Sequence, residues 1–249
     1  MDIQNRSTSE EVFANYNVEA RQASKSYFAN VFAFMFLALG ISAVVAYLFA
    51  ENTQWLRPLI NETGSGLSIL GYIVMFAPLG FVLLMSLGYR KLSAPVLIGL
   101  FVLYSGITGI TLSFILLIYT ANSVFACFAS ASVMFGVMAF MGYTTKQDLT
   151  KFGRIMMMGL IGIVVASLVN MFLQNGTMDY IISFIGVMVF TGLTAYDVQK
   201  IKQIGQGLDE NGQVITSEVK KLSIIGALTL YLDFINLFLM LLRLFGRRN

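Results

Sequence analysis

Histidine is absent from this chain of 249 residues, and cysteine occurs only once, at Cys127. Without histidine the chain has no imidazole for acid–base catalysis, for metal ligation or for switching charge near neutral pH. A lone cysteine cannot close an intramolecular disulfide, and Cys127 lies in an apolar run, so we expect it to be an inert packing residue. The net charge of +3 is too small to indicate a nucleic-acid partner.

Charged residues are also scarce. They make up 12% of the sequence, whereas hydrophobic residues make up 57% and the mean hydropathy is +0.77. Soluble domains carry about 25% charged residues, so this composition indicates an integral membrane protein surrounded by a lipid bilayer. Residues 1–25 are polar, with mixed charge and without the short apolar core of a signal peptide. We expect a cytoplasmic tail over residues 1–25 and a location in a bacterial inner membrane.

Long stretches without Asp, Glu, Lys or Arg follow this tail. A helix of about 20 apolar residues crosses a hydrocarbon core of about 30 Å. The 54 residues at 92–145 would reach about 80 Å as one helix, so they must contain two spans, with the break at "YTANS" (119–123). Membrane strands are excluded because the segments lack period-2 alternation. The sequence therefore predicts an all-α membrane protein, a bundle of seven transmembrane helices within residues 26–246, with spans at 26–50, 63–89, two within 92–145, 155–178, 180–196 with an apolar pattern continuing to 204, and 222–242.

Lysine and arginine are distributed unevenly over the predicted loops. Twelve lie in the tail and in the loops after spans 2, 4 and 6, and one, Arg57, lies on the opposite side. The excess of basic residues in cytoplasmic loops predicts a cytoplasmic N-terminus. Three more basic residues follow the last segment, and they would lie on the cytoplasmic side only if that segment were re-entrant: Arg243, Arg247 and Arg248. That segment is long enough to span, so we expect a full seventh crossing.

Two aspartates, Asp197 and Asp233, lie where the predicted helices cross the lipid. Ionisable residues inside membranes are rare and usually functional. If the sixth helix continues to Gly205, Asp197 lies about 12 Å from its cytoplasmic end, and Asp233 lies about 16 Å from the start of the seventh helix at Leu222. Because these spans are antiparallel, the two carboxyl groups can meet.

Two carboxylates in contact cannot both ionise cheaply in a site of low dielectric constant. We therefore expect Asp197 and Asp233 to share one proton and to titrate in two coupled steps. When deprotonated, the pair could hold a passing cation as its metal ligands. The alternative is that the two acids only hydrogen-bond neighbouring helices and hold the bundle together.

Four further side chains could support the pair. Asn236 follows Asp233 by three residues, on the same helix face. Tyr196 and Tyr231 each lie close in sequence to an acid and could donate a hydrogen bond to it, and Asn170 is a polar residue near the end of span 5. No cofactor is expected.

Two stretches of the last spans carry a resemblance to a known family. "TLYLDFINLFLMLLRLFG" (229–246) and "TAYDVQKIK" (194–202) resemble the Bax inhibitor family, the transmembrane Bax-inhibitor-motif proteins, in a bacterial-type member. The resemblance covers residues 26–246. It implies a seven-helix fold with the last helix at the centre, and a pH-sensitive calcium leak in which calcium ions and protons are the small partners. The paired aspartates of the family match Asp197 and Asp233.

The family also implies roles at the second span. Some members have a basic residue at its cytoplasmic end that bonds to the aspartate pair, and here Arg90 is the nearest match, with Lys91 as the alternative. Some members also carry a glutamate inside this span, whereas "GYIVMFAPLGFVLLMSLGYR" contains none. Any role of that acid, and the cation selectivity linked to it, does not carry over to this chain.

Two other functions compete with the leak. A non-conducting scaffold that binds other membrane proteins would need no ion path. An intramembrane aspartyl protease also needs two aspartates on adjacent helices, but its second acid follows Gly-x-Gly, where this chain has the bulky Leu230 and Tyr231. It also needs a downstream proline, and no proline follows Pro95. We therefore expect a protein that is not an enzyme.

Overall fold

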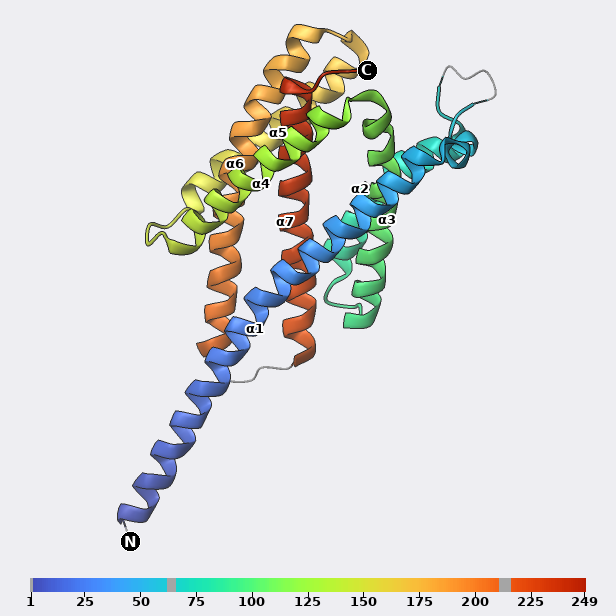
Figure 1. Cartoon of the computed structure of the whole chain (residues 1–249). Helices are drawn as coiled ribbons and strands as arrows, with labels where there is room; N and C mark the ends of the chain where they lie inside the picture. Colours follow the sequence, from blue (N-terminus) through green and yellow to red (C-terminus); the bar gives the residue numbers. More distant parts are fainter. Residues whose placement is uncertain (1, 62–65, 211–215) are drawn as a thin grey trace.

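The computed structural model describes the backbone of residues 2–61, 66–210 and 216–249, and the side chains of residues 25–61, 66–207 and 217–249. Within these ranges the chain is built from long helices and two isolated β-bridges (Figure 1). The elements are α1 (Asp2–Glu51), the short 3-10 helix η1 (Thr53–Leu59), α2 (Ile69–Gly88), α3 (Ala94–Ile118), α4 (Ala121–Thr144), α5 (Thr150–Leu173), α6 (Gly176–Glu210) and α7 (Thr216–Phe245).

Seven helices are long and apolar enough to cross a membrane, which confirms the predicted all-α fold with seven spans. The expected break at 119–123 lies at the turn between α3 and α4. Pro95 lies in the first turn of α3, where its missing N–H leaves no hydrogen bond unmade.

The helices extend beyond the charge-free stretches. The fifth helix begins at Thr150 and α7 begins at Thr216, whereas these stretches begin at residues 155 and 222. Long basic side chains at a helix end can place their charge in water while the backbone stays helical, so a charge does not mark a helix boundary. The predicted tail is likewise helical from Asp2 and continuous with the first span. Its cytoplasmic location stays a prediction.

The last two helices are the most buried spans. Within their most apolar stretches, 61% of the residues of α6 and 67% of those of α7 are buried, against 6% for α5. Helix α7 packs against α1, α2, α3, α4 and α6, whereas α5 packs against α6. Figure 1 shows α1 crossing the bundle obliquely in front of α7. The position of the last helix at the centre of the bundle stays a prediction of the resemblance.

The bundle has two end faces. The α6–α7 face holds the turns at 89–93 and 145–149, the end of α6 and the start of α7, and the C-terminal face holds the turns at 119–120 and 174–175 (Figure 1). The end of the chain binds the C-terminal face, since Thr120 N donates to Arg247 O at 2.9 Å and Asn249 N donates to Ile118 O at 2.9 Å. Helix α7 therefore crosses the whole bundle, as expected, and is not re-entrant.

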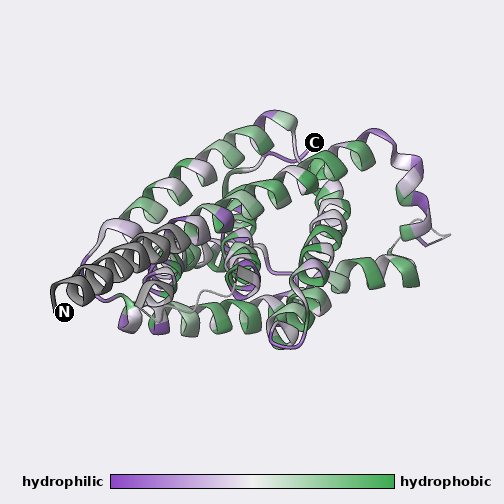
Figure 2. Ribbon diagram, turned by 90° about the horizontal axis from the view of Figure 1, so that it is seen from below, coloured by the Kyte–Doolittle hydropathy of each residue, from purple (hydrophilic) through white to green (hydrophobic). Residues whose placement is uncertain are grey.

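Hydrophobic residues cover the sides of the spans. Figure 2 shows hydrophobic colour along the helices and hydrophilic colour gathered at turns and helix ends. Large apolar side chains are exposed around the bundle, among them Leu79 on α2, Phe140 on α4 and Phe172 on α5. Such a surface would be costly in water and suits a hydrocarbon solvent.

Candidate functional site

The two aspartates come from the most buried pair of helices. Asp197 lies in α6 and Asp233 lies in α7, and these two helices pack along each other. The side chain of Asp197 is 7% exposed and that of Asp233 is 5% exposed. The two carboxyl groups interact directly through a side-chain hydrogen bond. The structure thus brings together the two acids that lie 36 positions apart in the sequence.

One oxygen of this pair has no donor from another residue. The Oδ2 atom of Asp233 is fully buried and accepts no hydrogen bond from another residue that the structure describes. A carboxylate offers only acceptors, so two ionised acids cannot bond to each other, whereas one protonated acid donates to the other. The contact between Asp197 and Asp233 therefore requires a proton between them.

Fully buried apolar residues lie near both acids along the same helices. Val198 is 0% exposed on α6, and Leu230 and Leu237 are 0% exposed on α7. On the far side of α6, a Cβ atom at Gly142 of α4 would collide with the backbone carbonyl of Ala195. The glycine thus lets α4 approach the backbone of α6 two residues before Asp197. The acids therefore lie in the packed interior of the bundle, with little of their surface exposed.

One cation acts on the pair from outside. Lys200, exposed on α6 three residues after Asp197, lies close enough to interact with it electrostatically. Lys200 is one of the twelve basic residues whose distribution predicts the orientation of the chain. The spacing of three residues on one helix was the signal that could have identified it.

Arg90 and Lys91 do not reach the aspartates. Both are exposed in the turn after α2, at the α6–α7 face. Arg90 Nε donates to Tyr89 Oη at 3.1 Å, and its guanidinium lies 5.7 Å from the centre of the same ring. This hydrogen bond raises the pKa of Arg90 above its ordinary value.

The two tyrosines point away from the acids. The ring of Tyr196 lies against Gly153 of α5. Tyr231 is 0% exposed, and its Oη lies 2.7 Å from Ser42 Oγ of α1, whose hydroxyl also donates to Ser105 O at 2.7 Å. Successive residues turn by about 100° around a helix, so residues two apart face nearly opposite sides. Proximity in sequence therefore gave the wrong partner for Tyr231.

The two asparagines have different surroundings. Asn236 is half-buried on α7, and its side chain forms no hydrogen bond within the described part of the chain. Asn170 closes the end of α5, because its Oδ1 accepts from Asn175 N at 3.1 Å and its carbonyl accepts from Gln174 N at 2.7 Å. Gln174 has a positive φ of 50° in this turn. Asn170 thus stabilises the turn to α6 at the C-terminal face and does not touch the pair.

No group of three or more acidic or cysteine side chains that could hold a metal ion occurs among the residues that the structure describes. Calcium in proteins takes six to eight oxygen ligands, so two carboxylates alone form an incomplete site. The contact of two carboxyl groups suits a shared proton.

Comparisons with known proteins agree with the motifs in α6 and α7. Residues 24–249 match the family model described as "Inhibitor of apoptosis-promoting Bax1". The inner membrane protein YbhL of Escherichia coli strain K12 is 46% identical over 232 residues, which cover 93% of this chain and 96% of the relative.

Two further relatives cover similar lengths. The uncharacterized protein RP147 of Rickettsia prowazekii is 42% identical over 90% of this chain and 91% of its own length. An uncharacterized membrane protein of Streptococcus pyogenes serotype M6 is 38% identical over 90% of this chain and 93% of its own length. None of these names states an enzymatic activity. The chain is an integral membrane protein and belongs to the Bax inhibitor family.

Proposed function

We propose that this protein is a pH-sensitive cation leak, with calcium as the permeant ion, and that Asp197 and Asp233 form its gate. The observation that carries the proposal is the direct contact of two carboxyl groups, 7% and 5% exposed, between two membrane-spanning helices. If the bundle needed only a polar contact between two helices, neutral amides or hydroxyls would provide it at a lower desolvation cost. Two carboxyl groups, unlike amides or hydroxyls, can also gain or lose a proton.

The protonation state of the pair would set the contact between α6 and α7. With one proton shared, the carboxyl groups hold the two helices together and exclude water. Without it, two negative charges repel each other at short range in a medium of low dielectric constant. The helices then separate or rotate, and the acids become ligands for a hydrated cation. The change is a shift of population between a closed and an open arrangement.

The surroundings of the pair support this mechanism. Because both acids are buried, we assign this conformation to the closed state of the proposed leak, and conduction would require movement. Lys200 acts on Asp197 from the helix surface and would favour its charged form after opening. Arg90 is held by Tyr89, so it could tune the gate only after leaving that ring.

Orientation and location form part of the proposal. The excess of basic residues at the α6–α7 face favours a cytoplasmic position for that face. The relative in Escherichia coli is named an inner membrane protein. We propose the same type of membrane here, with the N-terminus in the cytoplasm.

The test is calcium flux into proteoliposomes that enclose a fluorescent calcium indicator, measured across a range of pH. We expect flux above that of empty liposomes, with a rate that changes with pH. Asp197→Asn and Asp233→Asn keep the shape of each side chain but remove the shared proton, so each should abolish the change with pH. The matched control is Asp179→Asn, because Asp179 pairs with Arg243 at 3.7 Å on the C-terminal face, away from the gate.

Each other outcome points to a different function. Flux no greater than in empty liposomes would contradict the leak and favour a scaffold that binds other membrane proteins. Parent-like flux and pH response in both asparagine variants would contradict the gate. Cleavage of a membrane-spanning peptide, lost in either variant, would show a protease.

A further inference from the structure

A groove open to the side of the bundle runs between α1 and α4. Its volume is about 530 Å³, and α7 forms its floor. This α1–α4 groove is lined by residues that include Phe32, Phe36, Gly40, Phe128, Gly136 and Phe234. The ring centres of Phe128 and Phe234 lie 5.3 Å apart, so aromatic contacts join α4 to the floor.

The α1–α4 groove is apolar and open. Phe36 is 63% exposed and Phe128 is 43% exposed. Gly40 on α1 and Gly136 on α4 contribute no side chain, and a Cβ atom at either position would meet no atom within 4 Å. At this depth the surrounding solvent is hydrocarbon, so the groove suits an apolar ligand.

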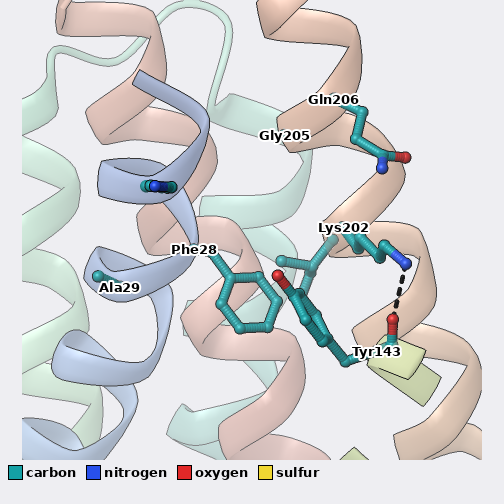
Figure 3. A pocket seen from close by; sticks show the side chains of 8 residues that line it. Phe28, Ala29, Tyr143, Lys202, Gly205 and Gln206 are labelled. Atoms are coloured by element: carbon teal, nitrogen blue, oxygen red, sulfur yellow. Dashed lines mark hydrogen bonds between the residues drawn. The ribbon is translucent and has the colours of Figure 1, made fainter. Parts of the chain in front are cut away.

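A basic pocket lies at the end of the groove that points to the α6–α7 face. It has a volume of about 230 Å³, and its lining includes Lys25 of α1, Tyr143 of α4, and Lys202 and Gln206 of α6 (Figure 3). Lys202 Nζ donates to Tyr143 O at 2.7 Å, which holds its charge at the pocket. Lys25 is exposed and forms no ion pair within the described part of the chain.

Aromatic rings connect the pocket to the groove. The ring centre of Phe28, which lines the pocket, lies 4.8 Å from that of Tyr143 and 5.0 Å from that of Phe32, which lines the groove. Figure 3 shows the rings of Phe28 and Tyr143 facing each other below the polar end of the pocket. Positive charge, aromatic rings and apolar groove thus follow one another along α1, toward the middle of the membrane.

The dimensions match one leaflet of a bilayer. The part of α1 that lines the groove, from Phe32 to Ala43, is twelve residues long and rises about 16 Å from the first to the last. One leaflet contributes half of a hydrocarbon core of about 30 Å. Lys25 precedes Phe32 by seven residues, or about 10 Å, which places its amine near the head groups.

We propose that the α1–α4 groove binds one anionic phospholipid of the leaflet at the α6–α7 face. One acyl chain lies in the groove, between Gly40 and Gly136 and over Phe234. The phosphate lies at Lys25 and Lys202, whose two positive charges select an anionic head group over a zwitterionic one. The proposal is independent of the calcium leak.

Native mass spectrometry of the purified full-length protein tests the site. The probe is an equimolar mixture of phosphatidylglycerol and phosphatidylcholine with identical acyl chains, added to the detergent solution. We expect the parent to retain one lipid, predominantly phosphatidylglycerol. Gly136→Leu fills the groove and should reduce retention of both lipids about tenfold. Lys25→Gln together with Lys202→Gln should instead reduce the preference for phosphatidylglycerol, by about fivefold for each lysine.

Matched controls separate the site from general surface effects. Gly162→Leu adds the same side chain on α5, where a Cβ atom also meets nothing within 4 Å, and Lys151→Gln removes an exposed charge at the same face. Both should retain lipid like the parent. Gly40→Leu fills the groove from α1, and it replaces Gly136→Leu as the test variant if Gly136→Leu does not fold. Equal lipid retention in all the glycine variants would contradict binding of the acyl chain in the α1–α4 groove. A parent-like preference for phosphatidylglycerol in the double lysine variant would contradict selection of the head group by Lys25 and Lys202.

Discussion

Asp233 retains a buried carboxyl oxygen that no donor from another residue satisfies. An unpaired buried polar atom costs about 1–3 kcal/mol, which is a large part of the stability of a small domain. A proton shared with Asp197 lets the two carboxyl groups bond to each other, whereas loss of the proton leaves two charges that repel each other. At the scale of the residue, the proposed gate therefore has two states that differ by one proton.

Tyr231 belongs to a hydrogen-bonded cluster with Ser42 and Ser105. A conservative substitution can distinguish the role of this cluster from that of the aspartate pair. Tyr231→Phe removes the hydroxyl 2.7 Å from Ser42 Oγ and leaves the ring in place. Ser42 still donates to Ser105 O, so we expect a loss of about 0.5–1.5 kcal/mol of unfolding free energy. Denaturant unfolding in detergent measures this loss. The pH response of calcium flux should be unchanged, and its loss would show that Tyr231 acts on the aspartate pair.

At the scale of the element, close helix contact holds the site. Gly142 lets α4 lie directly on the backbone of α6, and Gly226 of α7 faces Val31 of α1, whose Cγ2 would lie 3.1 Å from an added Cβ atom. Small residues at such contacts allow strong packing inside lipid, where the hydrophobic effect does not drive association. The distance between α6 and its neighbours is therefore set by backbone contact.

Two glycines of α4 give a matched test of this packing. Gly142→Ala places a methyl group against the carbonyl of Ala195, so it should destabilise the fold by about 1–3 kcal/mol. Gly136→Ala adds the same group on the same helix, where nothing lies within 4 Å. It should leave stability unchanged or raise it slightly, because alanine favours the helix. Thermal unfolding in detergent compares the two, and equal stability would contradict the close contact.

The turn between α4 and α5 gives a pH-dependent contribution to stability. Asp148 Oδ1 accepts from Thr150 Oγ1 at 2.5 Å and from Thr150 N at 2.9 Å, at the start of α5. These hydrogen bonds hold the pKa of Asp148 below its ordinary value. A lowered pKa in the folded state stabilises the fold above the ordinary value, about 3.9, and this contribution is lost as pH falls through the lower, folded value.

Asp148→Ala should therefore lower the melting temperature at neutral pH. The difference from the parent should shrink below about pH 4, as the parent itself becomes protonated. Differential scanning fluorimetry at several pH values measures the difference. A difference that stays constant down to acidic pH would contradict the role of the carboxylate.

Periodicity and charge predicted the elements better than the contacts between them. Stretches without charge gave all seven spans, because lipid forces each span to be a long apolar helix. The meeting of Asp197 and Asp233 followed from depth along two antiparallel neighbours. The partners of Arg90 and Tyr231 did not follow, because they depend on how each helix is rotated about its own axis. That rotation is set by packing, as between Gly153 and Tyr196, and sequence spacing does not record it.

At the scale of the whole molecule, the two ends of the chain belong to opposite faces. Seven crossings place the C-terminus beside the turn at 119–120, and the excess of basic residues predicts that the other face is cytoplasmic. The proposed lipid site would then face the cytoplasmic leaflet, whereas Asp197 and Asp233 lie near the middle of the spans.

Thiol labelling tests this topology. In a Cys127→Ala background, Ser9→Cys and Asn249→Cys introduce single thiols near the two ends of the chain. A membrane-impermeant maleimide should label Asn249→Cys in intact spheroplasts and Ser9→Cys only after the membrane is opened. Cys127→Ala alone controls for background. Labelling of both thiols in intact spheroplasts would contradict an odd number of crossings.

The central claim is that Asp197 and Asp233 act as one unit, and a double-mutant cycle tests it most directly. The measurement is the pH dependence of calcium flux into proteoliposomes for the parent, Asp197→Asn, Asp233→Asn and the double variant. A shared proton is lost when either acid is lost, so the double variant should behave like each single variant. Separate, additive effects of the two substitutions, or a pH response that survives in the double variant, would contradict the account.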